Sequence, residues 1–212
     1  DSFNLHFFGY IMSGRPFSII ETDGHSGDAG TRTRVEAFLH CVGQDHRLGT
    51  GKEAANDLRT VQSKSLHMSD LRKDRSLVLI PWMGPSSDVV AALLRGLDIP
   101  AEIIPPPDAE AIRLGQRHTS GKECLPIAMT LGALLQRLER AKDPGERFAY
   151  MFPGGTGPCR LGVYNILNQI VLDRVGWKDR IRFWSPVDVG YFDKTPPGFS
   201  VLASAGLLAA DL

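Results

Sequence analysis

Two kinds of segment alternate from residue 76 to the end of the chain. Short apolar runs bounded by turn residues are typical of buried strands, and the longer segments between them carry apolar residues at helical spacing. Such an alternation indicates an α/β fold with a mostly parallel, Rossmann-like sheet flanked by helices, and 42% hydrophobic residues are enough for its core. The predicted strands are 76–82, 101–105, 147–152 and 181–187, and the predicted helices are 87–97, 109–115, 126–140 and a long helix from Pro158.

The region before residue 76 predicts part of a second α/β lobe and a linker. Apolar residues at helical spacing after Phe3 predict one helix, and residues 16–23 resemble a strand. Val35 begins a second helical pattern, which Gly43 would end. The stretch that follows is polar and poor in long apolar runs. We therefore expect three parts: the end of an α/β lobe over 1–43, a polar linker over 44–75 and a Rossmann-like lobe over 76–212.

Charge and hydropathy argue against two classes of partner. Twenty-four basic residues balance twenty-four acidic ones, and no polybasic cluster indicates nucleic acid or a membrane surface. No apolar run reaches the roughly 18 residues that a spanning helix needs, and no charged and apolar leader opens the chain. We therefore expect a soluble, cytoplasmic protein that binds neither nucleic acid nor a membrane.

The three cysteines are too few and too scattered for a disulfide framework, so we expect reduced thiols. Cys41 lies beside Phe38 in a helical pattern and is predicted to pack in a core, as free cysteine commonly does. The chain opens at Asp1 rather than at a methionine, and its last residues, 205–212, resemble a helix in progress. We therefore expect the C-terminal part of a longer polypeptide.

Each of the other two cysteines directly precedes a predicted helix. Cys159 follows the glycine-rich turn 153–157, and Cys124 ends a loop before a helix whose first turn contains Pro126. Unpaired N–H groups and the helix dipole favour anions there, including a thiolate, a phosphate or a metal-bound sulfide. If both loops leave the same edge of the sheet, the two thiols face one crevice at the carboxyl ends of the strands.

Three chemistries come into question for these loops. A nucleophile at Cys159 would need a base, and His118 and His25 are candidates because both lie in polar or glycine-rich loops. An iron–sulfur cluster suits the thiols, but a cubane cluster usually takes four, so the others would come from other sequence, a partner chain or substrate. A phosphate loop is disfavoured, because Lys52 and Lys122 are each followed by glutamate rather than by serine or threonine.

A second polar cluster follows the strand predicted over 16–23. His25 and Ser26 lie in it beside two aspartates, and Arg32 and Arg34 follow at the start of the next helix. Such a loop either caps the helix and pairs its own charges, or contacts a charged ligand or a neighbouring domain. The residues leave both interpretations open.

Four segments together resemble the 2-hydroxyacyl-CoA dehydratase-related family, and most closely its large CoA-substrate-specific enzyme activases. The segments are ETDGHSGDAGTRTRVEAF, IPWMG, AEIIPPPDAEAIRLGQRHTSGKECLPIAMTLG and PGGTGPCRLGVYN. They cover most of the chain outside 44–75. The specific part of the resemblance is GKEC-x-P followed by GPCR-x-G-x-Y, with one helix and one strand between the two motifs.

The resemblance implies an oxygen-sensitive iron–sulfur protein of anaerobic metabolism, with a 4Fe-4S or double-cubane cluster between Rossmann-like lobes. It also implies an ATP-dependent activator region, absent here, that drives low-potential electron transfer to a CoA-ester dehydratase or a similar reductase. Cys124 matches the cysteine of the GKEC motif and Cys159 that of the GPCR motif, so both are candidate metal ligands. His25 and Ser26 match a loop that is usually Asp-Glu-His-Ser in the family, and Gly24 replaces the glutamate here.

Under this hypothesis, residues around the two thiols form the surroundings of the cluster. Gly154, Gly155 and Gly157 would let backbone N–H groups approach its negative charge. Arg160 and Lys122 would add positive charge that tunes its potential or binds an anionic substrate. No residue is assigned a catalytic role.

Several partners and two other functions stay open at this point. The expected partners are upstream domains of the same polypeptide, an ATP-dependent activator, a CoA-ester substrate and a second copy of the chain in a homodimer. The first alternative function is a non-catalytic docking or scaffold domain, whose glycine loops pack against other domains. The second is a cysteine-dependent acyl-transfer enzyme with Cys159 as its nucleophile.

Overall fold

The computed structural model describes residues 2–13, 15–20, 28–48, 66, 68–152, 154, 159–185, 204–206 and 208. The chain divides into two compact units, residues 1–62 and 63–212. The division falls inside the stretch 44–75, for which we predicted a linker. The loops that carry Cys124 and Cys159 therefore both belong to the second unit.

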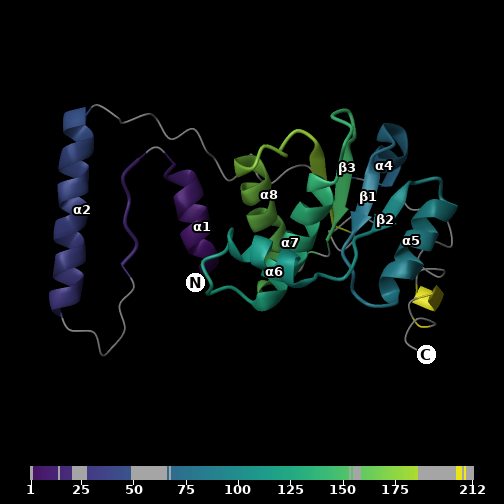
Figure 1. The fold of residues 1–212 in the computed structure, drawn as a ribbon, viewed down its shortest axis with the longest axis horizontal. Helices are drawn as coiled ribbons and strands as arrows, with labels where there is room; N and C mark the ends of the chain where they lie inside the picture. The colour runs from purple at the N-terminus through teal and green to yellow at the C-terminus, as the bar shows by residue number, and fades with distance from the viewer. Residues whose placement is uncertain are drawn as a thin grey trace. The chain divides into compact units, whose positions relative to one another are not determined.

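The first unit contains the helices α1 (Ser2–Ile11) and α2 (Asp28–Leu48), as Figure 1 shows. Both helices were predicted, but α2 continues beyond Gly43, because this glycine does not adopt the left-handed conformation of a helix stop.

The strand predicted over 16–23 is not formed over residues 16–20, which are irregular, and 21–23 lie outside the described residues. A strand needs a neighbouring strand to pair its backbone groups, and none of the described residues of this unit forms one. The described part of the first unit is therefore helical rather than α/β.

The second unit is built on a parallel sheet, as the alternation of segments predicted. In the part of the chain that the structure describes, the sheet has four strands in the order β2-β1-β3-β4. Every neighbouring pair is parallel, and Leu79 of β1, for example, pairs with Tyr150 of β3. The strands are β1 (Leu77–Ile80), β2 (Ala101–Ile103), β3 (Phe148–Met151) and β4 (Ile181–Trp184).

Helices cover both faces of this sheet, and α6, α7 and α8 lie on one side of it while α4 and α5 lie on the other (Figure 1). Because helices cover both faces, the two central strands β1 and β3 are continuously apolar, and all four residues of β3 are buried. Among the described helices, none combines the length and the apolar composition that crossing a bilayer requires. The helices are α4 (Met68–Asp74), α5 (Ser86–Gly96), α6 (Ala109–Gln116), α7 (Leu125–Glu139) and α8 (Tyr164–Arg174).

One predicted helix starts later than expected. The long helix predicted from Pro158 is replaced by a 3-10 turn, η1 (Arg160–Val163), and α8 begins only at Tyr164. Turns of this kind are frequent at the starts of α-helices, because the tighter winding satisfies groups that a full turn would leave unpaired. Cys159 consequently lies one short turn away from the body of α8.

The order of the strands creates a topological switch point between β1 and β3. From β1 the chain passes through α5 to β2 on one side, and from β3 it passes through α8 to β4 on the other. In open α/β sheets, ligands bind outside the carboxyl ends of the strands at such a point. The loop that leads from β3 to Cys159 starts at this point of the sheet.

Helices α6 and α7 are antiparallel and in backbone contact. A Cβ atom built on Gly115 would lie 1.9 Å from the carbonyl oxygen of Ala128, and one built on Gly132 would lie 1.7 Å from that of Ala111. Only glycine allows helix backbones to approach this closely. The close contact holds the end of α6 against the start of α7, and so it positions the loop that carries Cys124.

Candidate functional site

Cys159 occupies the N-cap position of η1. Its backbone is extended, with φ −72° and ψ 133°, and its thiol is exposed and makes no capping hydrogen bond. The chain reaches it from β3 through the glycine-rich turn, of which the structure describes Gly154. The Gly154 N–H donates to the Ser185 hydroxyl over 2.9 Å, so it is already engaged within the protein. Gly155 and Gly157 lie outside the described residues.

Cys124 occupies the equivalent position of α7. Its backbone is also extended, with φ −62° and ψ 136°, and its thiol is likewise exposed without a capping hydrogen bond. The preceding turn is closed by Glu123, whose carboxylate accepts from the N–H and the hydroxyl of Ser120 over 2.9 and 2.8 Å. Gly121 allows this turn, since its φ of +81° is a conformation that other residues rarely adopt.

The structure brings these two loops together, although 35 residues separate Cys124 from Cys159 in the sequence. Arg160 donates from Nη1 to the backbone carbonyl of Lys122 over 3.5 Å, which joins the residues next to each thiol. Both thiols also act on the buried Tyr164, which is 3% exposed. The two cysteines therefore belong to one site at the start of α7 and α8.

Tyr164 lies within electrostatic reach of both thiols. Burial, which is the largest cause, raises the pKa of its hydroxyl, and the charge of Cys124 and a hydrogen bond with it raise the pKa further. The charge of Cys159 acts in the same direction, and Arg160 acts weakly against it; together these causes raise the pKa to about 12.

The sequence interpretation missed Tyr164. The residue is the last letter of the GPCR-x-G-x-Y motif, but no role was predicted for it, and it neighbours Cys124 only through the fold. An aromatic residue five positions after a cysteine at a helix start was the one available signal. The signal is weak, because aromatic residues are common at buried helix positions.

Arg160 and Lys122, the predicted cationic residues, both lie at the site with exposed side chains. Arg160 adjoins Cys159, and its guanidinium reaches across to the Lys122 backbone. It therefore has a structural contact as well as a charge that favours thiolates and other anions. Lys122 contributes the acceptor of this contact through its carbonyl oxygen.

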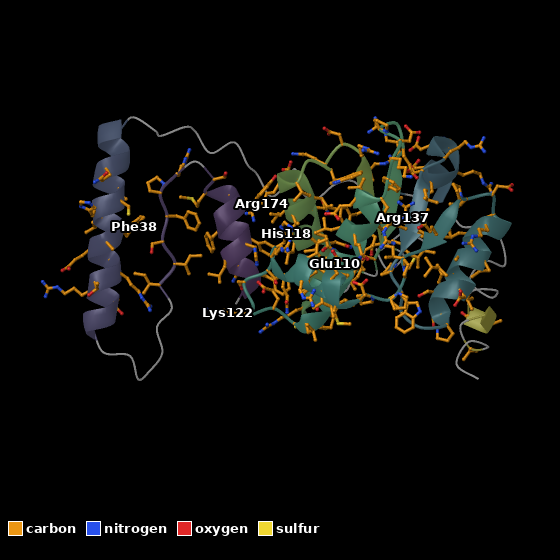
Figure 2. The ribbon with its side chains drawn as sticks, in the orientation of Figure 1. Phe38, Glu110, His118, Lys122, Arg137 and Arg174 are labelled. Atoms are coloured by element: carbon orange, nitrogen blue, oxygen red, sulfur yellow. The ribbon has the colours of Figure 1, made fainter. Side chains whose placement is uncertain are left out.

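His118, the candidate base, is partly buried near the end of α6. Burial and then the positive charges of Arg117 and Arg174 lower the pKa of its imidazole below the usual value, so the ring is neutral at pH 7. Figure 2 shows His118 beside Arg174. These neighbours are cations rather than a carboxylate that would orient a catalytic imidazole. The other candidate base, His25, lies with Ser26 outside the described residues.

The prediction that Cys41 packs in a core is wrong, because its thiol is exposed on α2. Phe38 and Val42, which suggested a buried face, are only half-buried, and Val35 and Leu39 of the same pattern are 38% and 61% exposed. Apolar spacing predicts which face of a helix would be buried, but burial also needs a second surface. The described residues of the first unit do not cover this part of α2.

The site offers a metal two thiolates. Within the described ranges of the chain, no three histidine, cysteine or acidic side chains are grouped as ligands of one metal ion. Two exposed thiols at helix starts, beside an arginine, suit a metal or cluster that takes thiolate ligands and carries negative charge. A complete ligand set would need donors beyond the described residues.

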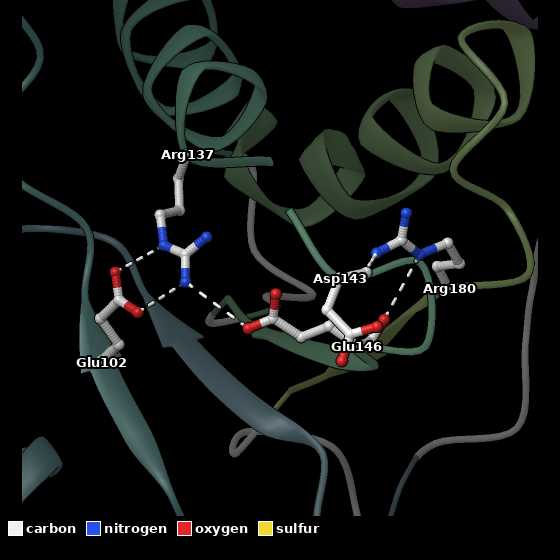
Figure 3. Close-up of polar contacts among 5 residues, drawn as sticks. All are labelled: Glu102, Arg137, Asp143, Glu146 and Arg180. Atoms are coloured by element: carbon white, nitrogen blue, oxygen red, sulfur yellow. Dashed lines mark hydrogen bonds and ion pairs between the residues drawn. The ribbon is translucent and has the colours of Figure 1, made fainter. Parts of the chain in front are cut away.

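A second cluster of charged residues lies at the other end of α7 (Figure 3). Arg137 donates to both carboxylate oxygens of Glu102 over 2.6 and 2.8 Å and lies 3.9 Å from Glu146. Arg180 donates to the backbone carbonyls of Asp143 and Glu146 over 2.6 and 3.3 Å. These contacts join β2, α7 and the turn before β3, and Glu102, Arg137 and Glu146 line an open hollow of about 610 Å³. We assign the cluster to the stability of the fold.

Three comparisons with known proteins find no match for the chain, neither a family model nor a curated protein nor a solved structure. The fold and the site therefore rest on the chain's own residues. The likeness to dehydratase-related proteins is a hypothesis that the two cysteine motifs support.

Proposed function

We propose that Cys124 and Cys159 supply two thiolate ligands to an iron–sulfur cluster in a dehydratase-like or activase-related electron-transfer protein. The observation that carries the proposal is the equivalent placement of the two thiols. Each stands exposed at an N-cap, and both act on the same buried tyrosine. An extended backbone is usual at an N-cap, so what links the two thiols is Tyr164, which neighbours both, and the bond from Arg160 to the Lys122 carbonyl.

The surroundings of the thiols favour negative charge. The N–H groups at the starts of α7 and η1 carry partial positive charge, and Arg160 adds a full positive charge beside Cys159. When bound, an iron–sulfur cluster accepts and donates single electrons at low potential. The role of this chain is to hold the cluster through Cys124 and Cys159 and to balance its charge through Arg160. The remaining ligands would come from sequence beyond the described residues or from a partner chain.

Partners and setting follow from the same proposal. An ATP-dependent activator region would deliver the electron, and a CoA-ester dehydratase or a similar reductase would receive it. The partners in contact would be upstream domains of the same polypeptide or a second copy of the chain. Cytoplasmic reducing conditions would keep the exposed thiols available for metal. A CoA ester is the substrate class that the motif resemblance suggests.

A docking role for the first unit is the second candidate. The observation that favours it is the exposure of Val35 and Leu39, which lie one helical turn apart on α2. Neighbouring apolar side chains on one exposed helix face indicate a surface that another protein part can cover. This role would not conflict with a cluster in the second unit, because the two candidates use different residues.

The test is the iron and acid-labile sulfide content of the full natural polypeptide, purified without oxygen, with an electron paramagnetic resonance spectrum of the reduced protein. We expect Cys124→Ser and Cys159→Ser each to lose the cluster. Cys41→Ser is the matched control, because Cys41 is an equally exposed thiol outside the site. A cluster that persists in both site variants would refute the assignment and leave the docking role as the stronger candidate.

A further inference from the structure

The strand β2 ends the sheet in the part of the chain that the structure describes, since β1 is its one neighbour there. The N–H of Ile104 donates to the Ile80 carbonyl over 2.8 Å, so Ile104 faces β1. Because the backbone groups of successive residues alternate in direction along a strand, those of Ala101 and Ile103 face the outer edge. Outward groups on an edge strand can pair with a strand of another chain.

An arginine of α5 occupies this edge. Arg95, in the last turn of α5, donates from Nε and Nη2 to the Ala101 carbonyl over 3.0 and 2.9 Å. The helix lies beside β2, and only residues 97–100 connect the two, so the arginine reaches the strand at its start (Figure 1). Two donors of one planar, charged group hold this acceptor, and the guanidinium stands where a pairing strand would lie.

Prolines limit the far end of the same edge. The next outward position after Ile103 is Pro105, which has no N–H to donate, and Pro106 and Pro107 follow it. Within the described strand, Ile103 is therefore the one outward residue that keeps both its donor and its acceptor available. A single residue cannot hold a second strand, because strand pairing needs a row of such bonds.

We propose that Arg95 closes the outer edge of β2 and so prevents a second copy of this chain from pairing its own β2 there. A second copy is the partner to exclude, because a two-fold axis would set two identical edges antiparallel and join two sheets into one. Short edge strands, charged side chains and prolines are the means by which proteins prevent such pairing, and β2 combines all three. No residue of the cysteine site takes part, so the inference does not depend on the proposed function.

The test is the self-association of Arg95→Met in the full natural polypeptide. Methionine keeps much of the aliphatic packing and removes both donors, so the Ala101 carbonyl becomes available at the edge. We expect the mass of the variant, measured by sedimentation equilibrium, to rise with concentration toward about twice that of the unchanged protein, as pairing of two copies requires. A variant with the mass of the unchanged protein at every concentration would overturn the inference.

Arg72→Met is the matched control. Arg72 also donates from Nε and Nη2 to one carbonyl, that of Leu97, over 3.0 and 2.7 Å, but this carbonyl follows α5 and does not belong to a strand. The control variant should keep the mass of the unchanged protein. If Arg72→Met associated as strongly as Arg95→Met, the loss of any surface arginine would be the cause, and the inference would be wrong.

Amide hydrogen exchange separates edge pairing from association through unfolding. In the associated Arg95→Met variant, the Ile103 N–H should become protected, while the N–H of Leu79 in the central strand β1 stays protected. Association in which Leu79 loses its protection would contradict an intact, opened edge.

The unchanged protein gives a further check that needs no variant. Its Ile103 N–H faces outward and should exchange faster than the N–H of Ile104, which donates to the Ile80 carbonyl. Slower exchange at Ile103 than at Ile104 would show that the outer edge is already paired, and it would overturn the inference.

Discussion

Gly132 of α7 lies directly against the carbonyl oxygen of Ala111 in α6, and a Cβ atom on this glycine would come within 1.7 Å of that oxygen. Gly132→Ala must therefore push the two helices apart. We expect the free energy of unfolding to fall by about 2 to 3 kcal/mol, the upper part of the range for overpacked sites. Urea unfolding followed by circular dichroism measures the change.

Gly96→Ala is the control for this prediction. Gly96 ends α5, has ordinary helical backbone angles, and would place its new Cβ in open space. The variant should be neutral or more stable by up to about 1 kcal/mol, because alanine restricts the unfolded chain. Equal stability of Gly132→Ala and the unchanged protein would show that α6 and α7 are not in backbone contact.

Arg137 connects β2 to the turn before β3 and is largely buried, with 14% of its side chain exposed. Arg137→Met keeps much of the aliphatic packing but leaves Glu102 without its partner. We expect a loss of about 1 to 2 kcal/mol in the free energy of unfolding, less than for a fully buried pair because Glu102 is partly solvated. Thermal or urea unfolding would record it.

The matched control for that variant is Arg32→Met. Arg32 pairs with Glu36 one helical turn away, but the two side chains are 82% and 62% exposed. Exposed pairs of this kind contribute little, so the change should stay below about 0.5 kcal/mol. If both arginine variants lost the same stability, the burial of Arg137 would not be the cause.

Asp108 makes the stability of α6 depend on pH. Its carboxylate caps the helix by accepting from the Ala111 N–H over 2.7 Å, and this bond, followed by one from Gln136, lowers the pKa of Asp108 below 3.8. The folded state thus holds the proton less tightly than the unfolded state. The ionised Asp108 carboxylate therefore stabilises the folded state fully above pH 3.8. This stabilisation is lost as the pH falls through the lowered pKa of Asp108 in the folded state.

Asp108→Asn tests this linkage, because asparagine also caps helices but does not titrate. The difference in unfolding free energy between the two proteins, measured by urea titration from pH 6 downward, should be constant near neutrality. Below about pH 4, the protein with Asp108 should lose stability relative to the Asp108→Asn variant. A difference that does not vary with pH would contradict the assigned cause.

Exposure of all three thiols predicts a pattern of alkylation. Without metal, iodoacetamide should modify Cys41, Cys124 and Cys159 in the folded protein, because each side chain is exposed. With the cluster in place, Cys124 and Cys159 should be protected and Cys41 should still react. Mass spectrometry of peptides separates the three sites.

The same experiment addresses thiol catalysis. A Cys159 nucleophile activated by a histidine would react many-fold faster than Cys41 at neutral pH, with no metal present. Similar rates at the two residues would argue against the acyl-transfer alternative. If the bound cluster protected Cys41 from alkylation as well as it protects Cys124 and Cys159, the assignment of these two residues as cluster ligands would be contradicted.

The local order of elements in the second unit was predictable from the sequence. Runs such as the one around Leu79 are apolar without interruption because both faces of a parallel strand are covered, and the spacing in α7 marks a helix with one buried face. Pro126 likewise marks the start of α7. These features depend on neighbours in the chain, so the chain alone reveals them.

Only the tertiary structure determined which residues far apart in the sequence come into contact. The loops that carry Cys124 and Cys159 lie side by side, joined by the bond from Arg160 to the Lys122 carbonyl, although 35 residues separate the two cysteines in the sequence. Tyr164 becomes part of the site only because these two loops lie side by side. Cys41 illustrates the opposite case, since its apolar neighbours predicted burial that no described surface provides. Periodicity states which face of an element can be buried, whereas only packing determines what, if anything, buries it.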